Sequence, residues 1–196
     1  IFLLSVIALC YLGYRDWQGR AVEHPPGVLV REQPKQVDVQ PSVFMLDDYQ
    51  VTRRASFVVR ARVLSRKPYY LGRAAGLSPI DLALGWGVMS DSAVLGQIDI
   101  SQSGRWYRTR FELPPPVAEQ QIVASSSNMH MMPANKAIGR ALKMLRVGDV
   151  VSVRGYLVDV EHASGWSWRS SLSRTDSGAG ACELVYVESL GVENPQ

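Results

Sequence analysis

The distribution of apolar positions divides the chain into an uncharged start and a mixed remainder. Residues 1–14 contain no charged side chain, whereas all 21 Lys and Arg and all 18 Asp and Glu residues follow them. Fourteen helical residues span about 21 Å, which is less than the roughly 30 Å hydrocarbon core of a bilayer. The chain does not begin with Met, and Tyr11, Tyr14 and Trp17 extend the run with side chains typical of a membrane interface. We therefore expect residues 1–17 to be a transmembrane anchor, truncated at its N-terminus.

A cleaved signal peptide is the alternative to a permanent anchor. No A-x-A cleavage site follows the apolar run, and Leu9 before Cys10 argues against a lipoprotein signal. A buried amphipathic helix is less favoured, because no polar face recurs at helical spacing. Arg15 and Arg20 favour a cytoplasmic flank, but Asp16 lies between them and the opposite flank is absent. We expect a permanent anchor in the lipid bilayer and a translocated C-terminal domain.

The remainder of the chain predicts a linker and one domain. Residues 18–41 are polar and proline-containing without an apolar period, which is typical of a linker. Residues 42–191 are enough for a single globular domain, and 192–196 form a tail. The two cysteines lie far apart in the sequence, which predicts no disulfide and excludes a C-x-x-C redox centre and a cysteine-rich zinc ribbon.

Within the domain, some segments repeat apolar residues at every second position, as strands do, and others at a period of 3.6 residues, as helices do. The clearest helix begins after Asn135, which is a favourable N-cap. Gly155 lies in a long β-branched run and predicts a sharply bent strand. We expect an α+β fold with a bent, mostly antiparallel β-sheet or a partly open OB-like barrel and one to three short helices. Strands are predicted at 57–64, 105–113, 121–125, 150–160, 166–173 and 183–190, helices at 78–84, from 90 and from 135, and a loop at 125–134.

Two segments carry candidate catalytic side chains. In the first, alternation would point Asn128 and His130 to one side, as an imidazole base with an amide orienter. The second segment, residues 165–183, is rich in serine and offers nucleophiles, but it contains no G-x-S-x-G or S-x-x-K motif that would support catalysis. Alternation in a hairpin explains the same serines as an outward face. The candidates for a hydrolase site are Asn128, His130, Ser170, Ser171, Asp176 and Cys182.

Aromatic and basic side chains suggest a binding surface. The alternating arginines and aromatics of 105–111 would suit single-stranded nucleic acid, but a half-exposed strand is the favoured interpretation. The net charge of +3 is also weak for a nucleic-acid partner. Three methionines around His130 suggest copper(I), but packing of methionine on apolar surface explains them better. No metal and no cofactor are predicted, and the candidate binding residues are Trp86, Arg105, Trp106, Arg108, Trp166, Trp168 and Arg169.

Several motifs resemble those of a family of bacterial membrane-anchored proteins that has no established activity. The similar segments are 77–87, 89–91, 100–103, 127–130, 166–171 and 180–183, so the similarity covers nearly the whole chain after the linker. The resemblance implies a bacterial envelope setting, with the anchor in the inner membrane and the domain in the periplasm. It brings no catalytic residues.

The function favoured by these observations is binding without catalysis. We expect an envelope domain that binds a protein, peptide or glycan partner close to the membrane. The alternative is a hydrolase that uses His130 with the Ser/Cys-rich hairpin. This function would require the two segments to converge in one pocket. Binding of single-stranded nucleic acid is a weaker alternative.

Overall fold

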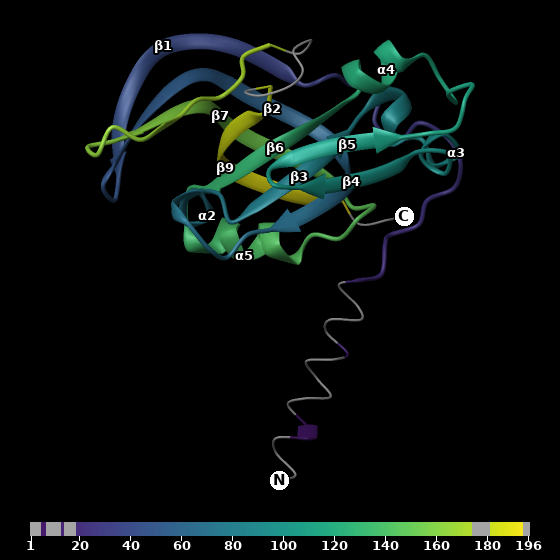
Figure 1. Cartoon of the computed structure of the whole chain (residues 1–196), viewed down its shortest axis with the longest axis horizontal. Helices are drawn as coiled ribbons and strands as arrows, with labels where there is room; N and C mark the ends of the chain where they lie inside the picture. Colours follow the sequence, from purple (N-terminus) through teal and green to yellow (C-terminus); the bar gives the residue numbers. More distant parts are fainter. Residues whose placement is uncertain (1–4, 7–12, 14–18, 174–180, 194–196) are drawn as a thin grey trace.

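The fold is a strongly bent β-sheet with short helices around it (Figure 1). The computed structural model describes residues 5–6, 13, 19–173 and 181–193. The strands are β1 Lys35–Leu46, β2 Tyr49–Pro68, β3 Ile80–Gly85, β4 Asp99–Ser103, β5 Trp106–Arg110, β6 Ser126–Pro133, β7 Val150–His162, β8 Ser167–Trp168 and β9 Glu183–Glu193. The helices are α2 Arg73–Leu77, the 3-10 helix η1 Gly87–Ser90, α3 Ser92–Leu95, α4 Glu119–Ala124 and α5 Lys136–Met144.

Seven strands form one sheet in the order β1-β2-β3-β6-β9-β7-β8. Every pairing in it is antiparallel except the parallel pair β6–β9. Strand β2 pairs with β7 over much of its length and with β3 near its C-terminal end, so the pairings run from β2 through β3, β6, β9 and β7 back to β2. The separate hairpin β4–β5 packs over β3 and β6 (Figure 1). The predicted bent, mostly antiparallel sheet of an α+β fold is confirmed.

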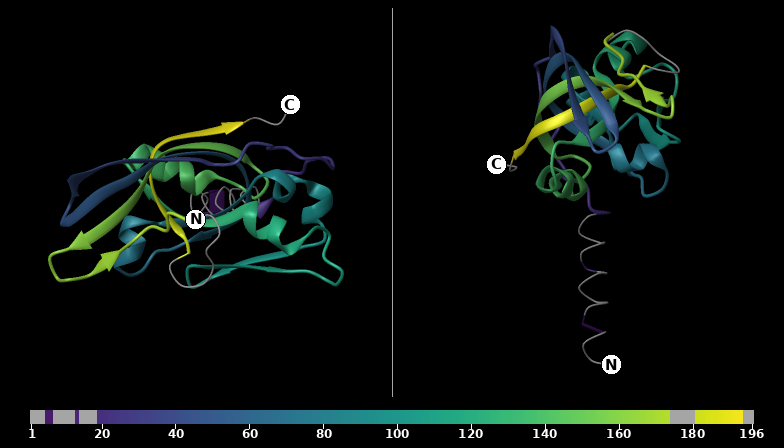
Figure 2. Two further views of the ribbon diagram at one scale, coloured as in Figure 1. Left: turned by 90° about the horizontal axis from the view of Figure 1, so that it is seen from above. Right: turned by 90° about the vertical axis from the view of Figure 1, so that its left-hand side faces the viewer.

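Gly155 lies where β7 closely approaches β9. The register between the two strands shifts between Arg154 and Gly155. A Cβ atom at Gly155 would lie 1.8 Å from the carbonyl oxygen of Tyr186, so no other residue fits without moving β9. The two views in Figure 2 show the sheet curving around its core. Glycine at this position is therefore required by the close approach of the β9 backbone.

The main core lies on the inner side of the curved sheet. Phe57 on β2, Leu82 on β3 and Met129 on β6 are fully buried there. Leu142 of α5 closes one end, and the side chain of Asn135 accepts a hydrogen bond from the backbone N–H of Ile138, as the predicted N-cap requires. Burial of this apolar surface is the main driving force for the fold.

Three local predictions are wrong, two of them because a central strand is buried on both faces. Residues 80–85 form the central strand β3 instead of a helix, and all six are buried. Residues 126–133 form the central strand β6 instead of a loop, while 121–125, predicted as a strand, lie mainly in helix α4. A strand buried on both faces loses the alternation by which strands are recognised, so its apolar run looks like a helix or an irregular segment.

The chain before the predicted domain is also part of the fold. Strand β1 begins at Lys35 and crosses the boundary predicted at residue 42. Val30 is completely buried in the main core. Strand β8 covers two residues of the strand predicted at 166–173. Most of the predicted anchor, 1–17, lies outside the described residues, and none of the helices within them is long and apolar enough to span a membrane.

Candidate functional site

Strands β3 and β6 carry polar side chains on the face opposite the main core. Asp81 is paired with His130, and Ala83 with Asn128. Successive side chains of a strand alternate between its two faces, so these four share a face while Leu82 points into the main core. The β4–β5 hairpin and the segment around β8 cover this face. Charged and amide groups are consequently held in a mostly buried environment.

A buried ion pair lies at the centre of this face. Nη1 of Arg105 is 2.5 Å from Oδ1 of Asp81, and Nη2 of Arg105 donates to the carbonyl oxygen of Ser78 at 3.0 Å. Asp81 is completely buried. Arg105 belongs to the β4–β5 turn and has a φ of 69°, which is unfavourable for a residue with a side chain. The ion pair therefore holds a strained turn against the sheet.

His130 contributes to the same cluster without completing its hydrogen bonds. Its Nδ1 lies 2.9 Å from Oδ1 of Asp81. The contact is poorly aligned, so His130 Nδ1 and Asp81 Oδ2 are both buried without a hydrogen bond to any described residue. A buried polar atom without a partner costs about 1–3 kcal/mol. The imidazole and the carboxylate are therefore in polar contact within the buried cluster.

Aromatic rings pack against the cation of the cluster. The guanidinium of Arg105 lies 3.9 Å from the ring centroid of Tyr69 and 5.1 Å from that of Trp168. The hydroxyl of Tyr69 accepts a hydrogen bond from the backbone N–H of Arg105 at 2.9 Å. Desolvation by burial raises the pKa of Tyr69. The rings of Trp168 and His130 are 4.8 Å apart. Rings from the segment after β2 and from β8 thus contact the same cation.

Asn128 joins this cluster to a neighbouring cavity. Its Oδ1 accepts a hydrogen bond from Nε2 of Gln102 at 2.6 Å, and its Nδ2 donates to the carbonyl oxygen of Arg105 at 3.1 Å. The same Nδ2 lies 3.6 Å from Sγ of Cys182. Asn128 therefore fastens the hairpin to the sheet, which is a structural role for its amide.

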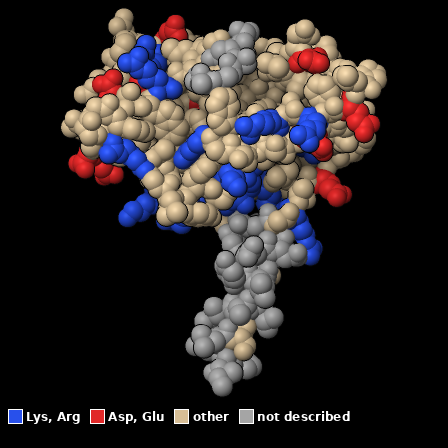
Figure 3. Space-filling model, in the orientation of Figure 1, with Lys and Arg blue, Asp and Glu red and all other residues tan. Residues whose placement is uncertain are grey.

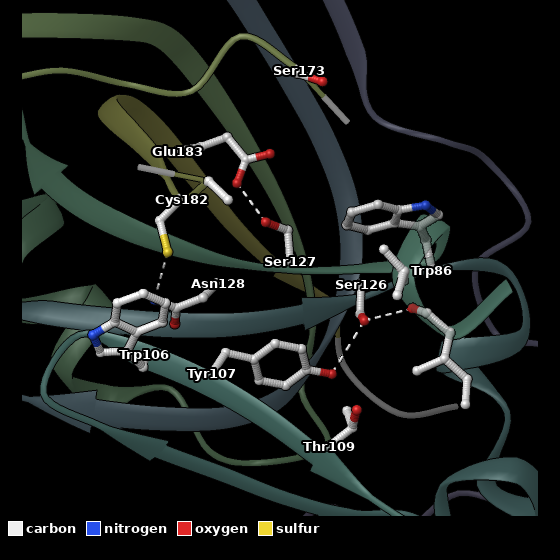
Figure 4. Close-up of a pocket in the computed structure, with 13 residues that line it drawn as sticks. Trp86, Trp106, Tyr107, Thr109, Ser126, Ser127, Asn128, Ser173, Cys182 and Glu183 are labelled. Carbon is white, nitrogen blue, oxygen red and sulfur yellow. Dashed lines mark hydrogen bonds between the residues drawn. The ribbon is translucent and has the colours of Figure 1, made fainter. Parts of the chain in front are cut away.

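The cavity lies between the β4–β5 hairpin, the start of β6 and the start of β9. It has a volume of about 220 Å³ and is walled by the rings of Trp86, Trp106 and Tyr107 (Figure 4). Trp86 is nearly buried and donates its indole N–H to the carbonyl oxygen of Ala124, whereas Trp106 is 42% exposed at the rim. The cavity therefore combines a fixed aromatic wall with an accessible one.

Polar groups lie between the aromatic walls. Tyr107 donates its hydroxyl to Oγ of Ser126, and desolvation raises the pKa of Tyr107 to about 12. Oγ of Ser127 donates to the nearly buried carboxylate of Glu183 (Figure 4). Glu183 is the charged residue among the described residues that line the cavity. The cavity accordingly offers hydrogen-bonding groups and negative charge, and none of its described lining residues is Lys or Arg.

The structure brings together several of the candidate catalytic residues. Parallel pairing of β6 with β9 places His130 opposite Leu184, whose backbone N–H donates to Oγ of Ser170 at 3.0 Å. The backbone N–H of Ser171 donates to the carbonyl oxygen of Cys182 at 3.1 Å. The segments that the hydrolase hypothesis requires are thus neighbours.

The geometry of a base and nucleophile is nevertheless missing. Among the described residues, no hydrogen bond joins His130 to Ser170, Ser171 or Cys182, and the polar contact of His130 is with Asp81. A general base needs hydrogen-bond reach to its nucleophile. Asp176 lies outside the described residues.

The candidate binding residues divide into three groups. Trp86 and Trp106 line the cavity. Arg105 and Trp168 belong to the ion-pair cluster, and Trp166 packs beside Trp168 with ring centroids 6.2 Å apart. The remaining two, Arg108 and Arg169, are exposed and lie outside the cavity and the ion-pair cluster.

Sequence reasoning missed several residues of the site. Asp81 was assigned to the helix predicted at 78–84, although it lies within the otherwise apolar run Ile80–Gly85. A lone acid in such a run is a signal for a buried charge, because an ionised carboxylate requires a partner in the interior. Tyr107 was considered only among the aromatic side chains of 105–111, and Glu183 was the first residue of the strand predicted at 183–190; neither was named as a candidate site residue. The contacts that define them come from segments far apart in the sequence.

The methionines around His130 do not surround it in space. Met129 and Met131 point into the main core, on the opposite face of β6 from the imidazole. Met132 is fully buried in a second apolar cluster. Packing in apolar surroundings therefore accounts for all three. Within the described part of the chain, no group of three or more His, Cys, Asp or Glu side chains could hold a metal ion.

Comparisons of the chain with protein-family models, with curated proteins and with solved structures give no match.

Proposed function

We propose that this chain is an envelope protein of the bacterial inner membrane, held by residues 1–17, whose periplasmic domain binds a glycan without catalysis. The observation that carries the proposal is the cavity between Trp86, Trp106 and Tyr107. Its volume of about 220 Å³ is below the roughly 300–1,000 Å³ of pockets that hold a whole drug-sized ligand. A cavity of this volume can hold one ring of a longer ligand.

The chemistry of the cavity favours a sugar ring. A sugar presents apolar C–H faces that pack on aromatic rings and a rim of hydroxyl groups that donate and accept hydrogen bonds. Ser126, Ser127 and Glu183 provide such partners beside the rings. A nucleic acid is less favoured, because its phosphates require cations. The described lining residues include none.

The order of strand pairings supports an OB-like, partly open barrel. Pairings run from β2 through β3, β6, β9 and β7 back to β2, and helix α5 lies between β6 and β7. OB-folds bind oligosaccharides and oligonucleotides on the face of their second and third strands and on adjacent loops. In this chain those strands are β3 and β6, which carry the candidate site. This support comes from the similarity of the strand order to that of OB-folds.

A hydrolase is the second candidate function. It is favoured by the 3.6 Å approach of Asn128 to Cys182. It would require His130 to leave Asp81 and reach a nucleophile. Cleavage of a glycan or peptide by the wild type that is lost in both Cys182→Ser and His130→Ala would establish it in place of binding.

The glycan proposal is tested by titrating the full chain in detergent with chitotetraose, a neutral oligosaccharide of N-acetylglucosamine, and measuring heat of binding. Trp106→Ala removes an accessible wall and should weaken binding at least about tenfold, which corresponds to about 1.4 kcal/mol. Tyr70→Ala is the control, because Tyr70 is an exposed aromatic side chain outside this cavity. Equal affinity of wild type and Trp106→Ala, or no binding by the wild type, would contradict the proposal.

A further inference from the structure

A second, larger groove lies between α2 and α5 and is positively charged. Its volume is about 910 Å³, and Arg73, Lys136, Arg140 and Lys143 line it together with one acid, Asp47. Figure 3 shows mainly Lys and Arg along the lower part of the domain, where Figure 1 places α2 and α5. The groove is therefore complementary to an anionic surface.

The side chains available for such contact are exposed. Lys136 and Arg140 lie four residues apart on α5, so they share one face of the helix, and both are exposed. Neither forms an ion pair with a described residue. Their charges are thus not neutralised by the part of the domain that the structure describes.

An apolar tip projects beside the charged groove. Tyr70 and Leu71, between β2 and α2, are 78% and 91% exposed. Tyr70 also lines the groove. Tyrosine is enriched at membrane interfaces, and an apolar tip next to cations is the pattern of a surface that enters the headgroup region of a bilayer.

The N-terminal segment joins the domain next to α5. The backbone N–H of Val22 donates to the carbonyl oxygen of Val147, in the turn that follows α5. A Cβ atom at Gly148 would lie 2.0 Å from the carbonyl oxygen of Val22, so the close approach requires glycine. Residues 18–21 can span at most about 14 Å. If 1–17 cross the membrane, α5 must lie near its surface.

We propose that the face formed by α5, the groove and the Tyr70–Leu71 tip lies against anionic phospholipid headgroups. This inference rests on the proposed membrane anchor but not on the glycan site. Lys136 and Arg140 bind lipid phosphates, and Leu71 enters the interface. Such docking fixes the orientation of the domain, with α5 and the Tyr70–Leu71 tip against the lipid.

The test places a polarity-sensitive NBD fluorophore on Leu71→Cys in the full chain, with Cys10 and Cys182 replaced by serine. The protein is reconstituted into vesicles of phosphatidylcholine alone or with phosphatidylglycerol at 30%, a test composition. NBD emission should shift to the blue and increase in the anionic vesicles. Replacing both Lys136 and Arg140 by Gln should lower the ratio of docked to undocked domain about 30-fold, since each cation near the surface contributes about 1 kcal/mol.

Matched controls separate docking from anchoring. NBD on Val43→Cys, an exposed position in the β1–β2 hairpin, should not respond, and Arg108→Gln with Arg110→Gln should leave the Leu71 signal unchanged. Flotation with phosphatidylcholine vesicles tests the anchor alone. An anchored protein whose Leu71 probe stays in water with anionic vesicles, or responds equally without them, would overturn the docking proposal. Failure to float would instead contradict the anchor.

Discussion

Arg105 is the residue on which the candidate site most depends. It adopts a strained backbone conformation, forms the ion pair with Asp81 and lies between the rings of Tyr69 and Trp168. Asn or Gly at this position would suit the backbone conformation but would leave the carboxylate of Asp81 without the arginine. The arginine is better explained by its contacts than by the turn, because such turns favour Asn and Gly.

Replacement of Arg105 by alanine should destabilise the chain by about 3–5 kcal/mol, because it leaves the buried charge of Asp81 without its main partner. Chemical unfolding of the full chain in detergent, followed by near-ultraviolet circular dichroism, measures the change. Arg108→Ala is the matched control: Arg108 is exposed and forms no ion pair with a described residue, so a change within about 0.5 kcal/mol is expected. A similar small effect at both positions would contradict the importance of the pair.

Tyr107 predicts how stability depends on alkaline pH. Its pKa in the folded chain is about 12 and its ordinary value is 10.0, so between these values the unfolded chain releases a proton that the folded chain retains. The contribution to stability is complete below pH 10 and is lost as the pH rises to 12, by roughly 2–3 kcal/mol.

The Tyr107→Phe variant should lose less stability than the wild type between pH 10 and 12, although at pH 7 it lacks the hydrogen bond to Ser126. The measurement is the free energy of unfolding at a series of pH values. Tyr70→Phe is the control, because Tyr70 is 78% exposed. Parallel curves for wild type and Tyr107→Phe would rule out the predicted protonation effect.

Among the elements, the close packing of β7 against β9 depends on Gly155. The substitution Gly155→Ala should destabilise the fold by at least about 2 kcal/mol, since the new methyl group meets the backbone of β9 at 1.8 Å. Gly191→Ala on β9 is the matched control, because its Cβ atom would meet nothing closer than 3.9 Å. Thermal unfolding of both variants tests the expectation, and equal melting temperatures would show that the two strands can separate without cost.

The accuracy of the element predictions depended on how each element is buried. Helix α5 was predicted from its cap at Asn135 and its apolar period, because one of its faces remains in water. Strand β3 was missed, since Ile80–Gly85 is buried on both sides and shows no alternation. The pattern of apolar and polar residues along an element shows only whether its two faces differ in burial. Where no such difference exists, the tertiary environment decides between helix and strand.

At the scale of the whole molecule, the anchor and the domain predict a topology. A reporter enzyme that is active only outside the cytoplasm, fused to the C-terminus of the full chain, should be active in a bacterial host. The matched control is the same fusion without residues 1–17, which should be inactive. An inactive full-length fusion whose counterpart with a cytoplasmic reporter is active would place the domain in the cytoplasm.

The candidate site itself was predictable in part. His130, Asn128, Trp106 and Arg105 were selected by residue type and spacing, and they do belong to two adjoining groups of side chains on β6 and the β4–β5 hairpin. Asp81 was not selected, because its meaning depends on Arg105, which is 24 residues away. Two residues that are distant in the sequence and meet only in the folded sheet form no local sequence pattern by which their pairing could be recognised.

The uncharged start, the strands with one wet face and the capped helix were all readable from the sequence, since each follows from interactions between residues close along the chain. The tertiary structure alone decided that β3 and β6 are neighbours, that Asp81 is neutralised by Arg105, and that aromatic rings enclose a cavity beside them. Burial and charge pairing depend on which distant segments share a dry interior, and that is a property of the folded chain.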